Sequence, residues 1–279
     1  MRTMIRPIVL LLLVLLLAGC GVRMAYNNLD RLMLRWVDSQ VSLDAEQTIV
    51  ARGMIESHLD WHCATELPDY AIWLRRIDAD IGSGQMTVEV LEHHAETMTT
   101  FWHRLLTTMR PSMIEMIALL SDHQLEELED AFAERNKEIA TRAEMGGGER
   151  LEQRVDSMER GLRRFMGRLD GEQRRRLESW AGELKRIDES TLDETLRWQQ
   201  AFFEVARNRH DPEFEHVVAG LLDPANNWSD EHWELMAHNR ERTLHVLSEI
   251  LDQASDRQVG RLRSRLVSLA DDFDRLTCL

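Results

Sequence analysis

Apolar residues in this chain recur at spacings of three and four, the period of an α-helix, and this constrains the fold more than any other feature. One seam runs through positions 151–169 and another through 259–276. The chain has only 5 prolines and little strand-like alternation. Helices with one apolar stripe must bury it against partner helices. We therefore predict an all-α fold, a multi-helix bundle of about eight helices.

A short motif at four positions marks helix starts. Residues 43–47, 120–124, 169–173 and 254–258 each carry Asp or Ser three positions before a glutamine. In such a capping box the Asp or Ser side chain accepts a hydrogen bond from the first helical turn, and the glutamine accepts one from the cap's own N–H. The first two copies lie 77 residues apart and the last two 85, which suggests two similar halves.

Three consecutive glycines, Gly146 to Gly148, interrupt the helical pattern near the middle of the chain. They separate two candidate halves, residues 20–145 and 149–279, which follow a leader of residues 1–19. Glycine runs break helices, so two interpretations are open. The run is either a hinge between the halves or a loop between helices of one domain.

The first twenty residues have the pattern of a secretory signal. Arg2 and Arg6 precede an apolar run over 8–17, and this run is too short to span a bilayer. The run ends in Leu-Ala-Gly-Cys, which resembles the lipobox of bacterial lipoproteins. The resemblance implies that the signal peptide, residues 1–19, is cut between Gly19 and Cys20. It also implies that Cys20 carries a covalent lipid, palmitate included, as the membrane anchor; no other cofactor is expected.

The residue after Cys20 is glycine, not the aspartate that retains many lipoproteins in the inner membrane. By that analogy we expect the periplasmic face of the outer membrane. Without residues 1–19 the chain has 32 basic and 49 acidic residues, a net charge of −17. Such a charge repels nucleic acid and anionic lipid, so we expect no nucleic-acid partner and attachment through the lipid.

Two cysteines remain besides Cys20. Cys63 and Cys278 form an even pair in an oxidising compartment, which predicts a disulfide closing a loop of more than 200 residues. The bond would place the C-terminal tail beside the helix that carries Cys63. Two buried free thiols are the alternative.

His58 and His62 lie four apart on a predicted helix, a spacing at which two histidines can bind zinc. The spacing fixes no third ligand, and the His-Glu-x-x-His order of metalloproteases is absent. The alternative is a structural pair beside Cys63. No nucleophile elbow, phosphate loop or dinucleotide fingerprint occurs, so we assign no catalytic residues.

Residues 160–176 are locally basic, with seven arginines against Asp170 and Glu172. One interpretation is a site for an acidic client, a lipopolysaccharide phosphate or another anion. The preferred interpretation is a solvated face laced by ion pairs four residues apart. The expected pairs are Asp156–Arg160, Glu159–Arg163 and Glu172–Arg176.

Most of the 8 tryptophans fall at seam positions and are expected in the core. Trp36 lies about sixteen residues after Cys20, and two interpretations are open for it. Its segment, with Leu29, Leu32, Met33 and Val37, either rests on lipid headgroups or packs beneath the bundle. We prefer packing beneath the bundle.

Residues 26–30, 34–36 and 43–47, with Trp61-His62 and 65–71, resemble the opening of an uncharacterised family of proteobacterial lipoproteins. This implies an all-helical periplasmic lipoprotein with a domain of unknown function and no known activity. The helix starts of Leu-x-x-x-Gln form are also similar to the LTxxQ periplasmic chaperones of the Spy and CpxP type, although Asp or Ser replaces their Thr. That resemblance implies a binding role.

We therefore expect a non-enzymatic envelope protein that binds a protein, a peptide or another envelope component through helix faces. One alternative is a metal-dependent hydrolase that uses the His58/His62 region. Another is a structural or stress-related envelope component.

Overall fold

The computed structural model describes residues 25–276, and every regular element in that range is helical, which confirms the all-α prediction. The described helices are close to the eight or so expected. The α-helices are α3 (Leu29–Asp38), α4 (Ala45–Trp61), α5 (Leu67–Gly82), α6 (Val88–Leu119), α7 (Asp122–Glu144), α8 (Gly147–Met166), α9 (Gly171–Glu183), α10 (Asp188–Arg207), α11 (Phe214–Leu221), α12 (Asp230–Asp252) and α13 (Asp256–Asp274). A π-helical turn, His62–Glu66, joins α4 to α5, and a 3-10 turn, Pro224–Asn226, precedes α12.

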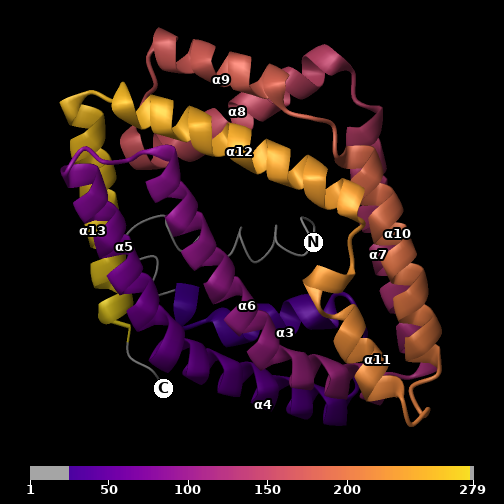
Figure 1. The fold of residues 1–279 in the computed structure, drawn as a ribbon. Coiled ribbons are helices and arrows are strands. Elements are labelled where there is room, and N and C mark those ends of the chain that lie inside the picture. The colour runs from indigo at the N-terminus through magenta and orange to yellow at the C-terminus, as the bar shows by residue number, and fades with distance from the viewer. Residues whose placement is uncertain (1–24, 277–279) are drawn as a thin grey trace.

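The long helices form the sides of a frame (Figure 1). In that view α5 and α13 lie on the left, α7 and α10 on the right, and α8, α9 and α12 along the top. Helices α3 and α4 occupy the lower part, and α6 crosses between top and bottom. Because α5 packs against α13 and α7 against α10, both candidate halves contribute to two sides of the frame.

All four predicted capping boxes are present, and they set the starts of α4, α7, α9 and α13. In each, the cap side chain accepts a hydrogen bond from the backbone N–H three residues on, and the glutamine side chain accepts one from the cap's N–H. These bonds satisfy first-turn N–H groups that would otherwise lack partners. The N-caps are Asp44, Ser121, Asp170 and Ser255.

The capping boxes also meet in pairs through their glutamines. The amides of Gln47 and Gln124 donate to each other over 2.9 and 2.6 Å, and all four atoms are buried. Gln173 and Gln258 repeat the arrangement over 3.2 and 2.8 Å. The spacings of 77 and 85 residues therefore mark partners in space, and the repeated arrangement supports an internal duplication.

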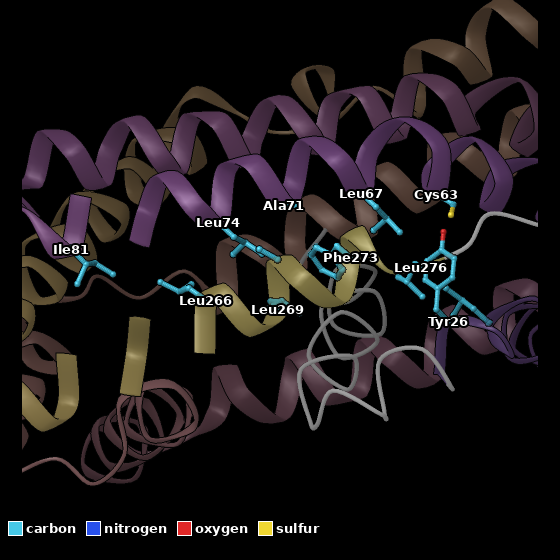
Figure 2. Packing of buried hydrophobic residues seen from close by; sticks show 12 residues of the cluster. Tyr26, Cys63, Leu67, Ala71, Leu74, Ile81, Leu266, Leu269, Phe273 and Leu276 are labelled. Carbon is cyan, nitrogen blue, oxygen red and sulfur yellow. The ribbon is translucent and has the colours of Figure 1, made fainter. Parts of the chain in front are cut away.

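Three separate hydrophobic clusters hold the helices together, and the first joins α3, α5 and α13. Ala71 of α5 and Ala270 of α13 are both fully buried, which lets these helices approach closely. Figure 2 shows Leu74, Leu266 and Phe273 between the same two helices. The predicted seam over 259–276 thus packs against a helix that lies far away in the sequence.

The second cluster joins α6, α7, α10 and α11 around Phe202 and Phe203, and the third joins α8, α9 and α12 around Leu177 and Ile250. The seam predicted over 151–169 contributes to the third cluster. Its first member is an exception, because Leu151 lies 40% exposed. The glycine run stands at the start of α8, where Gly146 is the N-cap.

No helix within residues 25–276 is long and apolar enough to cross a membrane. The predicted signal peptide, with its cleavage site at Gly19 and Cys20, lies outside the described residues, as does Cys278.

Candidate anion-binding site

The two histidines four residues apart point to different partners. His58 Nε2 lies 2.8 Å from Ser112 Oγ on α6, and His62 Nδ1 lies 3.1 Å from the hydroxyl oxygen of Tyr26. Burial lowers the pKa of His62 to about 4, so its ring is neutral at pH 7. The described residues contain no group of three or more His, Cys, Asp or Glu that could hold a metal ion. The structure therefore brings no third ligand to this pair.

Cys63 lies in the π-helical turn between α4 and α5, and its side chain is buried in the first cluster. It is disulfide-bonded, and the other half of the bond lies outside the described residues. Leu276 packs in the same cluster, two residues before Cys278, as Figure 2 shows. The C-terminal segment therefore docks near Cys63, while the pairing with Cys278 stays a prediction.

One partly buried serine–histidine pair has the residue types of a nucleophile and its base. Ser190 Oγ lies 2.7 Å from His232 Nδ1, and the histidine ring stacks on Trp228. The nearby carboxylate of Glu194 accepts its hydrogen bond from Ser229, at 2.5 Å, instead of orienting the histidine. The acid–histidine bond of a catalytic triad is thus missing from this set.

The basic segment 160–176 departs from its predicted ion pairs. None of the three expected pairs forms. Arg174 instead pairs with Asp156, Glu159 and Glu178, and Glu172 pairs with Arg175. The reason is tertiary: α9 packs against α8, so acids of α8 meet an arginine of α9 before they meet those of their own helix.

This exchange leaves part of the segment without counter-charges. Arg160, Arg163, Arg164 and Arg168 are exposed and make no ion pair within residues 25–276. The preferred interpretation, a face laced by ion pairs, was therefore wrong for these four arginines. The arginines of α9 do form ion pairs, but with other partners than predicted.

Arg168 lines an open pocket of about 290 Å³ between the starts of α9 and α13. The lining residues are Arg168, Asp170, Ser255, Arg257, Gln258 and Arg261. The pocket therefore lies at the second capping-box pair, and it combines residues from two segments some ninety positions apart.

Local backbone geometry places these arginines. Gly167 ends α8 with φ 86°, a conformation that favours glycine, and turns the chain so that Arg168 follows beside α13. The Arg168 carbonyl accepts a hydrogen bond from the Gln258 amide over 3.0 Å. The guanidinium of Arg261 lies over Gly167, where Nη1 would be 2.2 Å from an added Cβ. The missing side chain thus makes room for Arg261.

The pocket is cationic. Arg168, Arg257 and Arg261 make no ion pair within residues 25–276. The only acid in the lining, Asp170, already accepts hydrogen bonds from the backbone N–H groups of Glu172 and Gln173 as the α9 N-cap. The charge of Asp170 offsets the positive helix end of α9, and three arginines against this one carboxylate leave the lining with a net positive charge. Arginine forks in this setting suit a carboxylate or a phosphate.

The first capping-box pair has the same scaffold but a different charge. There, Ser42 stands five positions before the first glutamine, and its carbonyl accepts from Gln124 over 2.7 Å. Glu127 stands three positions after the second glutamine and accepts hydrogen bonds from the Ser42 N–H and hydroxyl, over 2.8 and 2.9 Å. These contacts tie the segment before α4 to α7 at the first pair.

At the second pair, the position of the serine is held by Arg168 and that of the glutamate by Arg261. Two cations replace a hydrogen-bonded acid and hydroxyl, and an open pocket lies at this pair. The repeated scaffold therefore carries an acid at the first pair and arginines at the second.

Sequence reasoning found half of this site. The basic segment 160–176 included Arg168. Arg257 and Arg261 lie in and just after the fourth motif copy, and no sequence pattern singled them out as binding residues. Aligning the motif copies exposes them, because Arg261 occupies the position that Glu127 holds in the second copy.

The fold and the pocket define an all-helical protein with an exposed, arginine-lined candidate anion site. The chain belongs to a family of unknown function (DUF6279), whose model matches residues 39–233. The match includes Arg168 and ends before Arg257 and Arg261. No curated protein and no solved structure matched the chain in the corresponding searches.

Proposed function

We propose that this chain is a lipid-anchored, non-enzymatic binding protein of the bacterial envelope, and that its arginine pocket holds an anionic group of the ligand. One observation carries the binding role: three arginines surround a pocket without an ionic partner, in a chain of net charge −15. The Leu-Ala-Gly-Cys sequence at 17–20 supports the anchor, and the glycine instead of aspartate after Cys20 supports the outer-membrane location.

The three guanidinium groups of the pocket carry like charges. Guanidinium groups that share one pocket repel each other, and an anion between them removes this repulsion while it gains charge-assisted hydrogen bonds. Acidic residues are abundant in this chain, yet none neutralises the three arginines. An envelope ligand with a phosphate or carboxylate group supplies the missing charge.

The binding role is tested on the mature protein in detergent by titration calorimetry at low salt, with inorganic phosphate, pyrophosphate and citrate as probes. We expect saturable binding of at least one probe, which also separates phosphate from carboxylate preference. Arg261→Glu, which copies the first pair, should weaken binding at least tenfold. Arg160→Glu makes the same charge change on α8 outside the pocket and should have little effect. Equal losses in both variants, or no saturable binding, would contradict the proposal.

The anchor is tested separately. Replacement Cys20→Ser should leave an uncleaved precursor without lipid, and globomycin treatment should leave an uncleaved precursor of the wild type. Mass spectrometry should find acyl chains on Cys20 of the untreated wild type. Unchanged processing and fractionation in the variant would refute lipidation and leave the anion pocket unaffected.

A further inference from the structure

Helix α3 presents an exposed face that combines apolar and basic side chains. Leu32 and Trp36, one turn apart, are 44% and 41% exposed. Arg31 and Arg35, also one turn apart, are exposed beside them. The preferred prediction, that this segment packs beneath the bundle, is confirmed for Leu29 and Met33, whereas Leu32 and Trp36 stay exposed.

The orientation of this face is fixed by packing. Leu29 is buried and Met33 packs against the first cluster, so these two residues, which the sequence grouped with Trp36, belong to the core side. Just before α3, the Tyr26 hydroxyl donates a hydrogen bond to the Leu59 carbonyl over 3.1 Å. The exposed face cannot turn inward without breaking these contacts.

The exposed side chains of α3 carry two basic groups, Arg31 and Arg35, against one acid, Asp38, whereas the molecule as a whole is acidic. Arg31 and Arg35 make no ion pair within residues 25–276, and the guanidinium of Arg135 lies 5.5 Å from the centre of the Trp36 ring. One arginine of α7 thus lies over the indole, and two exposed arginines of α3 stand next to Leu32 and Trp36 in the sequence, in a chain of net charge −15. Arginine with tryptophan is the combination that suits a membrane–water interface, where the ring sits among headgroups and the guanidinium binds phosphate.

The length of the chain before α3 restricts what the face can meet. Ala25 packs against the first cluster, and it lies five positions after Cys20. A fully extended chain spans about 3.5 Å per residue, so an acylated Cys20 lies within roughly 18 Å of Ala25. The protein surface around α3 is therefore held close to any bilayer that holds the lipid.

We propose that the exposed face of α3 lies on the phospholipid surface, with Leu32 and Trp36 at the headgroup boundary and Arg31 and Arg35 on lipid phosphates. This inference rests on the acylation of Cys20 proposed above. It adds a second, protein-borne contact to the lipid anchor and fixes which side of the molecule faces the membrane. The arginine pocket, on α9 and α13, is then free to meet a ligand.

The test uses mature, acylated protein in vesicles of phosphatidylethanolamine and phosphatidylglycerol. An environment-sensitive NBD label is placed at Leu32→Cys and, as a control, at Leu151→Cys, whose side chain is 40% exposed on α8 at the opposite side of the frame (Figure 1). Wild type treated with the same reagent is the blank. We expect nitroxide lipids to quench the label at 32 at least threefold more than the label at 151.

A charge variant gives a second readout. Arg31→Glu/Arg35→Glu should reduce quenching at position 32 to the level of the control site. The matched pair Arg160→Glu/Arg164→Glu, also one turn apart, exposed and unpaired, should leave it unchanged.

Equal quenching at 32 and 151 in protein whose Cys20 is acylated would overturn the membrane contact and leave the proposed function intact. A blue shift at 32 that follows protein concentration and ignores lipid quenchers would identify a second copy as the occupant and also overturn it. Absence of acyl chains on Cys20 would overturn both the anchor and this inference. The phosphate titration would still test whether the arginine pocket binds an anion.

Discussion

Gly167 is the residue on which the geometry of the arginine pocket depends most. Its φ of 86° disfavours any side chain, and an added Cβ would meet Arg261 Nη1 at 2.2 Å. We expect Gly167→Ala to lower the free energy of unfolding by about 1–3 kcal/mol and to weaken anion binding. Gly161→Ala, in α8 with nothing within 4 Å of its Cβ, should instead raise stability by about 0.5–1 kcal/mol. Chemical denaturation of both variants checks this; equal effects would contradict the strain at Gly167.

His62 makes folding pH-dependent in a defined window. Burial lowers its pKa to about 4 from an ordinary value near 6.5, so between these pH values the unfolded chain binds a proton that the folded chain does not. Stability should therefore fall as the pH drops from 7 to 5, by about 2 kcal/mol from this residue.

Unfolding by urea at pH 7 and pH 5 measures the effect, and His62→Gln should show a smaller loss than the wild type. Burial also lowers the pKa values of His58 and His232. The free energy of unfolding of that variant should therefore still fall to some extent between pH 7 and pH 5. An unchanged loss in His62→Gln would contradict the assignment.

At the level of elements, helix starts were predictable and helix partners were not. A capping box involves only four consecutive residues, so Asp44 and Gln47 are enough to predict the start of α4. Contacts between helices depend on the whole chain: nothing near Glu159 signals that Arg174 of α9 will replace Arg163 as its partner. The same limit explains why the sequence identified Arg168 but not its pocket neighbour Arg261.

The closest helix pair, α5 with α13, depends on small residues at its contact. Ala270 is fully buried against α5, so Ala270→Leu inserts three carbon atoms where there is no space. We expect a loss of about 1–3 kcal/mol in the free energy of unfolding. Val267→Leu on the exposed side of α13 is the control and should change stability little. Similar values for both would mean that the contact is loosely packed.

At the level of the whole molecule, a covalent bond is predicted to join distant parts of the chain. Cys63 is disulfide-bonded, and Leu276 packs in its cluster. Non-reducing mass spectrometry should find a peptide that links Cys63 to Cys278. Reduction should then lower the free energy of unfolding by up to about 5 kcal/mol, because the bond closes a loop of more than 200 residues. A link to Cys20, or alkylatable thiols at both positions, would refute the pairing.

The close packing of α5 and α13 has a consequence for biosynthesis. Everything from Gly82 to Asp256 is made after α5 ends and before α13 begins. At 5–20 residues per second, α5 therefore waits roughly ten seconds or more for the helix that covers Ala71, Leu74 and Ile81. A nascent chain with these apolar side chains uncovered is exposed to aggregation, and the synthesis of α13 ends this vulnerable period.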